Sequence, residues 1–159
     1  MKEYAKLWLD YTPKKNNREC EKLKKFTFTG AKESDIVLQN AVSELKAGLS
    51  GMLGIEPEVI IGPAGETVVI SCGKDMQDAE EYTVSISGDG LKIESKSSSG
   101  ILYGVFDVLR TIACEKKIEE VYGSGRTVRP SQPLRMLDHW DNMDGSIERG
   151  YSGESSGIL

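Results

Sequence analysis

The chain has little of what metal sites and disulfide frameworks are built from. Its 159 residues include one histidine and three cysteines, and Cys20, Cys72 and Cys114 are far apart in the sequence. There is no CxxC pair and no Cys/His spacing typical of zinc ligands. We therefore expect no metal site, no cofactor and no disulfide framework. Cys72 and Cys114 each end an apolar stretch, which predicts two small buried side chains.

Long apolar runs and an excess of positive charge are also missing. No run approaches the ~20 residues of a membrane-spanning helix, and the first residues lack the order of a signal peptide. These features predict a cytoplasmic protein with no membrane partner. The net charge is -5 and the basic residues are scattered, apart from Lys22, Lys24 and Lys25. We therefore expect no nucleic-acid partner.

The apolar share of 38% and the charged share of 28% are typical of a globular protein. The length suits one domain, or one domain and part of another. Residues 4–11 alternate apolar and polar side chains, which predicts a strand. Residues 13–25 are polar and predict a loop. The β-branched and aromatic residues 26–29 predict a short edge strand.

Two long helices are predicted by apolar stripes. The first begins after Ser34, a candidate N-cap, and ends at Gly54; Gly48 and Gly51 near its end favour close approach of a neighbouring backbone. Its stripe consists of Leu38, Ala41, Val42, Leu45, Leu49, Met52 and Leu53. The stretch 97–100 caps the second helix, whose stripe consists of Ile101, Leu102, Val105, Phe106, Leu109 and Ile112.

Strand patterns separate the two helices. They cover residues 58–61, 67–72, 81–87 and 91–95, with a hairpin turn at 88–90. The fold class that follows is α+β, with a mixed, mainly antiparallel sheet packed by two helices. Residues 115–133 are polar and contain Gly and Pro, which predicts a linker. We place the domain boundary after it, with one domain at 1–133 and the start of another at 134–159.

The segment from 139 to 151 carries the densest chemistry. A short apolar run, 134–137, leads into the chain's one histidine, a tryptophan, and several carboxylates and amides. Such a strand end is typical of the mouth of a barrel strand, and aromatic faces with polar edges suit a sugar ring. A structural network of buried hydrogen bonds explains the same residues equally simply. The pocket candidates are Trp140, Asp141, Asn142, Glu148 and Arg149.

Three stretches resemble glycoside hydrolase family 67, the xylan-debranching α-glucuronidases. Residues 7–11 are similar to the family's opening strand, and residues 100–110 to a helix motif of its N-terminal domain. Residues 135–151 match its signature at the entry to the catalytic barrel, and this motif is long and specific. The helix motif also occurs in β-hexosaminidase N-terminal domains. Residues 153–159 depart from the family, which continues there with apolar and aromatic residues.

The resemblance implies an N-terminal domain like that of hexosaminidases, followed by a (β/α)8 barrel. It implies a hydrolase that inverts configuration while removing α-1,2-linked (4-O-methyl)glucuronic acid from xylan-derived aldouronic acid oligosaccharides. The family's catalytic carboxylates come from later barrel strands, so no catalytic residue is expected in this chain and the fragment should be inactive. Two other hypotheses stay open: a stand-alone carbohydrate- or protein-binding module, and a fragment of a hexosaminidase-type glycosidase. A lone barrel strand would leave its backbone unpaired, so residues beyond about 133 are expected to be disordered, to pair with the first domain's sheet, or to mediate a homodimer.

Overall fold

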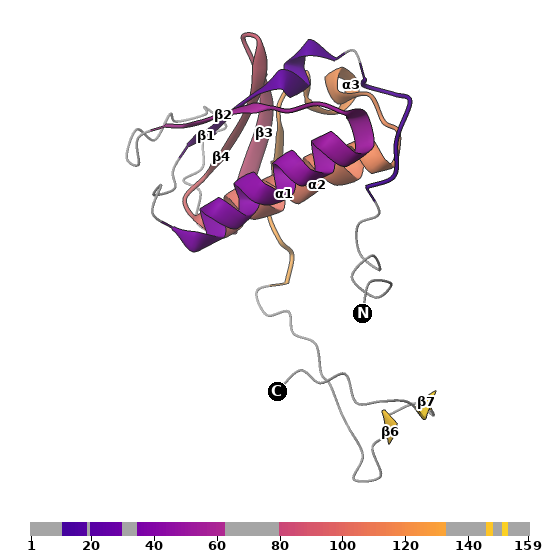
Figure 1. The fold of residues 1–159 in the computed structure, drawn as a ribbon. Coiled ribbons are helices and arrows are strands. Elements are labelled where there is room, and N and C mark those ends of the chain that lie inside the picture. The colour runs from indigo at the N-terminus through magenta and orange to yellow at the C-terminus, as the bar shows by residue number, and fades with distance from the viewer. Residues whose placement is uncertain are drawn as a thin grey trace.

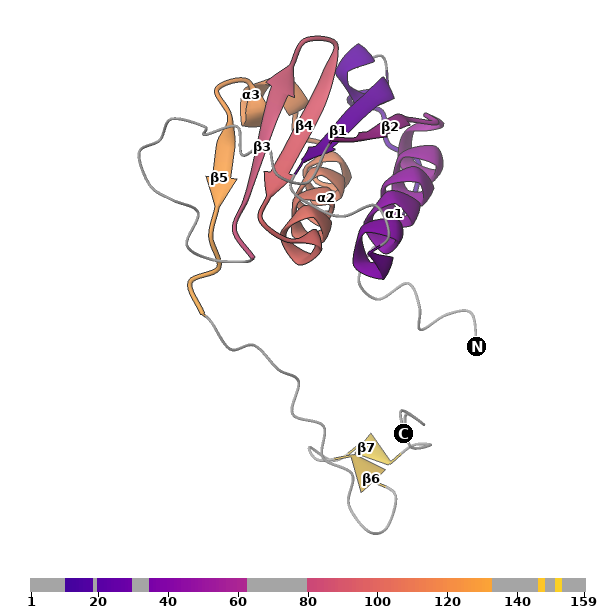
Figure 2. The same cartoon turned by 90° about the vertical axis from the view of Figure 1, so that its left-hand side faces the viewer.

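The fold is a five-stranded sheet with two long helices packed side by side against one face (Figures 1 and 2). In this computed structural model the described residues are 11–18, 20–29, 35–62 and 80–132, together with the backbone of 146–147 and 151–152. The expected α+β class is confirmed. The strands expected at 4–11 and 67–72 lie outside the described residues, apart from Tyr11.

The sheet has the order β2-β1-β4-β3-β5 and is evenly mixed. Strand β1 (Lys25–Thr29) is parallel to β2 (Glu58–Ile61) and to β4 (Gly90–Ser95). Strand β3 (Tyr82–Ser87) is antiparallel to β4 and to β5 (Arg126–Val128). The expected sheet is therefore right in being mixed and wrong in being mainly antiparallel, because β1 receives a parallel neighbour on each side.

The edge position expected for residues 26–29 is wrong, because β1 lies between two strands. Phe26 and Phe28 are fully buried and face Leu91 and Ile93 of β4 in register. The 3-10 helix η2 (Glu21–Lys24) precedes β1 and buries Leu23, so the loop expected over 13–25 is interrupted here. The crossover from β1 through a helix to β2 gives the parallel pairing that a hairpin cannot provide.

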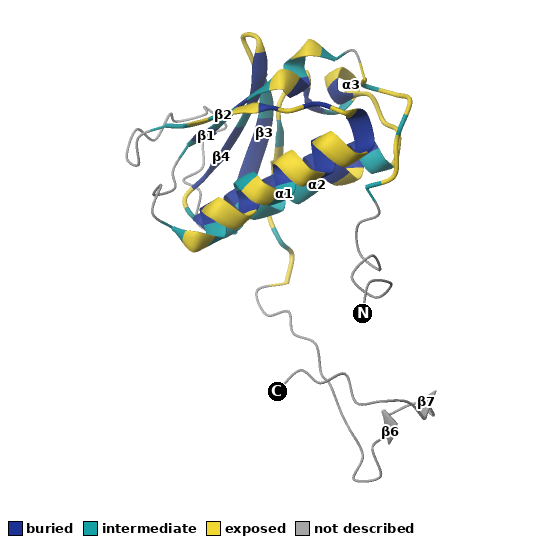
Figure 3. Ribbon diagram, viewed as in Figure 1, coloured by how far each residue is buried: buried dark blue, intermediate teal, exposed yellow. Residues whose placement is uncertain are grey.

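Helix α1 (Ile36–Leu53) covers the sheet on the side of β1 and β2, and its predicted stripe is buried except for Val42, which is partly exposed (Figure 3). Its N-cap is Asp35, whose side chain accepts a hydrogen bond from the Val37 amide. The expected N-cap, Ser34, is therefore wrong by one position. Gly54 ends the helix at φ 70°, the left-handed conformation that glycine adopts without strain. The Ser98 hydroxyl also donates to Asp35, at 2.6 Å, which links the first turns of the two helices.

Helix α2 (Ser98–Ala113) is capped as predicted by Ser97, which accepts a hydrogen bond from the Gly100 amide. The two helices approach closely at Gly48, where a Cβ would lie 2.5 Å from a methyl carbon of Leu109. At Gly51 a Cβ would lie 3.0 Å from the Tyr11 carbonyl oxygen, which confirms the expected backbone approach. Gly48 of α1 therefore lets Leu109 of α2 approach closely, and Gly51 makes room for the backbone at Tyr11.

The linker expected over 115–133 is wrong between 118 and 128. Helix α3 (Ile118–Tyr122) and strand β5 belong to the domain, and Ile118 and Tyr122 are fully buried. The expected burial of Cys114 is also wrong, because this cysteine follows the last turn of α2 and is exposed. Cys72 lies outside the described residues. Further along the chain, β6 (Ser146–Ile147) pairs antiparallel with β7 (Tyr151–Ser152).

Candidate functional site

All five pocket candidates from the sequence, namely Trp140, Asp141, Asn142, Glu148 and Arg149, lie outside the described residues. The structure therefore gives no geometry for that segment beyond the pairing of β6 with β7. The described part of the chain offers a different site, between α2 and β3.

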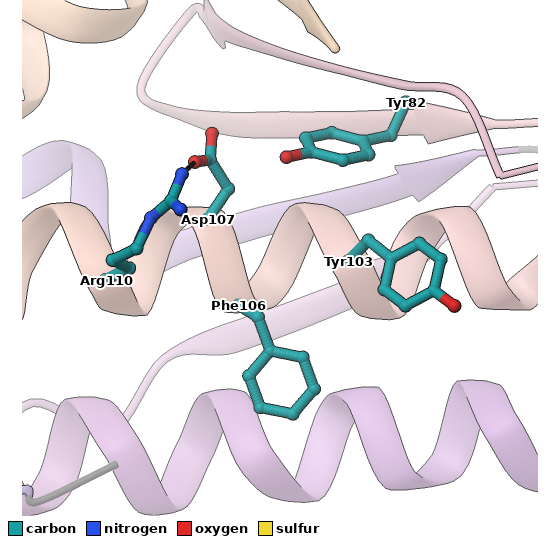
Figure 4. A pocket seen from close by; sticks show the side chains of 5 residues that line it. All are labelled: Tyr82, Tyr103, Phe106, Asp107 and Arg110. Atoms are coloured by element: carbon teal, nitrogen blue, oxygen red, sulfur yellow. Dashed lines mark hydrogen bonds and ion pairs between the residues drawn. The ribbon is translucent and has the colours of Figure 1, made fainter. Parts of the chain in front are cut away.

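This site is a shallow hollow of about 160 Å³ between α2 and β3 (Figure 4). Tyr82 contributes one wall from β3, and four residues of α2 contribute the rest. The α2 residues follow the helical repeat, since 103, 106, 107 and 110 are three or four positions apart and share one face. We name this site the α2 hollow; it is lined by Tyr82, Tyr103, Phe106, Asp107 and Arg110.

Asp107 lies at the base of the α2 hollow, with a side chain that is 1% exposed. Its Oδ1 accepts a hydrogen bond from Arg110 Nη2 at 2.7 Å, and its Oδ2 accepts one from the Tyr122 hydroxyl at 3.1 Å. Arg126 of β5 pairs with the same Oδ2 at 3.6 Å. The Tyr122 hydroxyl is in turn 2.9 Å from Thr111 Oγ1. One carboxylate thus joins α2, α3 and β5.

The electrostatic environment follows from this burial. Burial, and next the negative charge of Asp107, raise the pKa of Tyr82 to about 12. Burial is also the main cause of the raised pKa of Tyr122, so both phenols stay protonated and able to donate. The hydrogen bond to Asp107 raises the pKa of Arg110, which therefore keeps its positive charge.

The arrangement is suited to holding structure and not to glycoside hydrolysis. Both oxygens of Asp107 are occupied by protein donors, and glycosidases use two carboxylates across a substrate ring. Among the described residues, no group of three His, Cys, Asp or Glu side chains comes together as metal ligands. Within the same ranges, no helix is both long and apolar enough to cross a membrane.

Sequence reasoning missed this cluster although one signal was present. Asp107 interrupts the apolar stripe of α2 between Phe106 and Val108, and Arg110 follows at i+3. An acidic residue on a buried helix face requires partners, since an unpaired buried charge is costly. Tyr122 and Arg126, which supply two of those partners, lie in the segment that was expected to be a linker.

Comparison with known proteins found similar sequences. A model of the glycosyl hydrolase family 67 middle domain matches residues 114–158. The probable alpha-glucuronidase A of Neosartorya fischeri is 29% identical over 166 residues, covering 93% of this chain and 19% of that protein. The resemblance to glycoside hydrolase family 67 is confirmed.

Two further family relatives agree. The probable alpha-glucuronidase A of Aspergillus oryzae is 27% identical over 163 residues, covering 93% of this chain and 19% of that protein. The alpha-glucuronidase A of Aspergillus tubingensis is 37% identical over 78 residues, which is 49% of this chain and 9% of that protein. The chain thus spans about a fifth of the length of the curated relatives that it matches along most of its length. The middle-domain match crosses the boundary expected between 133 and 134, which stays a prediction.

Proposed function

We propose that this chain is the front part of an α-glucuronidase of glycoside hydrolase family 67. The observation that carries the proposal is the match along 93% of the chain to proteins named alpha-glucuronidase A, together with the middle-domain match at 114–158. The substrates would be xylan-derived aldouronic acids, from which the enzyme removes α-1,2-linked (4-O-methyl)glucuronic acid.

The reaction is proposed to invert configuration at the anomeric carbon. An inverting glycosidase needs one carboxylic acid at the leaving oxygen and one carboxylate that activates water, roughly 6.5–9.5 Å apart. We propose that both carboxylates lie in the part of the full protein that follows this chain. Trp140, Asp141, Asn142, Glu148 and Arg149 remain candidates for lining or supporting the sugar pocket, because they stand in the signature segment 135–151.

The decisive experiment compares this 159-residue chain with the product of its full open reading frame. Both are incubated with an aldouronic acid that carries terminal 4-O-methylglucuronic acid, and products are followed by proton NMR. We expect the full product to release the β-anomer of the uronic acid first and this chain to release none. Release by the purified chain alone would refute its inactivity, and initial release of the α-anomer would refute inversion.

The five pocket candidates are tested in the full product by single substitutions to alanine. A residue that contacts the sugar should raise KM or lower kcat while the melting temperature stays constant. A residue that only supports the pocket should lower the melting temperature as well. Glu154→Gln is the matched control, because Glu154 follows the signature segment. It should leave KM, kcat and the melting temperature unchanged.

A further inference from the structure

The α2 hollow is an apolar surface that the described residues leave open. Tyr103 and Phe106 are only partly buried, as is their neighbour Leu102. The remaining large apolar side chains of α2 are fully buried, namely Ile101, Val105, Val108, Leu109 and Ile112. Figure 4 shows Tyr103 in front of α2, Tyr82 above the helix beside the sheet, and Phe106 directed below it. Aromatic side chains that keep part of their surface exposed and lie together can form an interaction site, whereas single exposed apolar residues are ordinary.

The size of the hollow indicates what it receives. Its volume of about 160 Å³ is below the range of roughly 300–1,000 Å³ that is usual for small-molecule pockets. One large apolar side chain of a protein partner fits such a space, and pockets filled by a single anchor residue are typical of the centres of protein interfaces.

The position of the hollow in the chain indicates which partner. Tyr82, one wall of the hollow, pairs directly with Val128, the last residue of β5. Arg126, two residues earlier, reaches the carboxylate at its base. The chain therefore leaves the domain beside the hollow, and the family match to the middle domain includes this exit. The polypeptide that follows is at high effective concentration next to the hollow, because it is tethered there.

The charge at the rim adds a requirement. The Arg110 side chain is 65% exposed, although one of its nitrogens is held by Asp107. The donors of Arg110 that Asp107 does not hold can donate to a carboxylate or a carbonyl of a partner.

We propose that the α2 hollow is the seat of the middle domain of the same protein, which inserts one apolar side chain among Tyr82, Tyr103 and Phe106 and places an acceptor group on Arg110. This interface rests on the proposed function, since it requires that a family 67 middle domain follows in the protein. It makes the N-terminal domain a support for the catalytic part, and the Asp107 cluster fixes both the seat and the chain exit.

Footprinting tests the seat without any substitution. The 159-residue chain and the full open-reading-frame product are labelled with hydroxyl radicals, and oxidation is read peptide by peptide. We expect labelling of Tyr103 and Phe106 to fall roughly tenfold in the full product, as at a desolvated interface core. Ile36, which is 71% exposed on α1, serves as the internal control and should be labelled equally in both.

A substitution pair tests whether contact at the seat stabilises the domain. In the full product the N-terminal domain should melt at a higher temperature than in the isolated chain. Phe106→Ser should abolish this difference, whereas Ile36→Ser should retain it. Because Phe106→Ser is also measured in the isolated chain, a general loss of folding is distinguished from a loss of docking.

The outcomes separate this inference from the proposed function. Equal labelling of Phe106 in a full product that releases glucuronic acid overturns the seat and leaves the function standing. Protection of Phe106 in a full product that releases no glucuronic acid supports the seat and overturns the proposed function. Protection that rises with the concentration of the isolated chain identifies a second copy as the occupant and overturns the proposal. A reading frame that encodes no further domain overturns it too.

Discussion

Asp107 lies where α2, α3 and β5 meet, and its carboxylate is the acceptor that joins them. The side chain is 1% exposed, but its two arginine partners are 65% and 39% exposed, so both arginines can regain water if the carboxylate is lost. The Tyr122 hydroxyl keeps Thr111 as a partner in that case. Loss of the carboxylate therefore removes favourable contacts without leaving a fully buried unpaired charge.

The Asp107→Ala variant is expected to lose about 2–3 kcal/mol of unfolding free energy, as for hydrogen bonds to charged groups in a buried site. Urea denaturation followed by circular dichroism measures the change. Asp89→Ala is the matched control, because Asp89 pairs with Lys25 on an exposed turn, and its midpoint should not move. Equal midpoints for the two variants would show that the Asp107 cluster contributes no stability.

Cys20 lies beside Glu119, whose Oε1 accepts from its thiol at 3.0 Å. Burial first, and then this carboxylate, raise the pKa of the Cys20 thiol from 9.0 to about 11. A raised pKa means that the folded state holds the proton more tightly than the unfolded state. The thiol thus stabilises the fold fully below pH 9 and loses that contribution as pH rises from about 9 to about 11.

Iodoacetamide should therefore alkylate Cys20 slowly at pH 8, since only the thiolate reacts. We expect a rate roughly 100-fold below that of an unshifted thiol, which corresponds to two pKa units. The rate should rise about tenfold per pH unit until pH 11. Peptide mass spectrometry follows Cys20 separately, and Glu119→Gln should accelerate the reaction because one cause of the shift is removed. A Cys20 rate that levels off at or below pH 9 would contradict the raised pKa.

At the scale of elements, α2 depends on close contact with the sheet. A Cβ on Gly104 would lie 2.6 Å from Ile93 Cγ2 and 3.3 Å from Tyr82 Cδ2. Alanine would favour the helix by about 1 kcal/mol in isolation. Here the steric conflict with two sheet residues is the larger effect, because overpacking a filled core costs ~1–3 kcal/mol.

Gly104→Ala is therefore expected to lower the unfolding free energy, against the helix propensity of the new residue. Ser50→Ala provides the matched control, since Ser50 is exposed on α1 and alanine there changes helix propensity without new contacts. If the packing argument holds, the melting temperature falls for Gly104→Ala and rises for Ser50→Ala. A rise in melting temperature for Gly104→Ala would mean that α2 shifts away from β4 at little cost.

The two long helices could be predicted from the sequence because their apolar stripes repeat over four or more turns. Helix α3 and strand β5 could not, since five and three residues carry too little periodicity and β5 is defined by its pairing with β3. The central place of β1 likewise depends on distant partners, Glu58–Ile61 and Gly90–Ser95. Its alternating pattern alone fits an edge strand equally well.

The cap of α1 and the Asp107 cluster illustrate the same limit at a site. Ser34 and Asp35 are both good N-caps by residue type. Asp35 serves because it also accepts from Ser98, a residue 63 positions away. The polar character of Asp107 was visible in the sequence, but Tyr122 and Arg126 reach it only after α3 and β5 have folded back onto α2. Long-range contacts of this kind leave no local pattern.

At the scale of the whole molecule, the fully described core lies between Leu23 and Tyr122, with Val128 packed against it. These residues come from both helices, the sheet and α3, so they form one cooperative unit. If the predicted boundary after residue 133 is right, the residues beyond it add no contact on which this core depends.

A chain of residues 1–133 is therefore expected to unfold in urea with the same midpoint and the same m-value as the 159-residue chain. An unchanged m-value means that the surface exposed on unfolding is unchanged, since m scales with that area. Removal of residues 126–133 as well should lower the midpoint, because β5 and the Arg126 contact to Asp107 are then lost. A lower midpoint for the 1–133 chain would place the boundary further along the sequence, within the stretch that matches the family's middle domain.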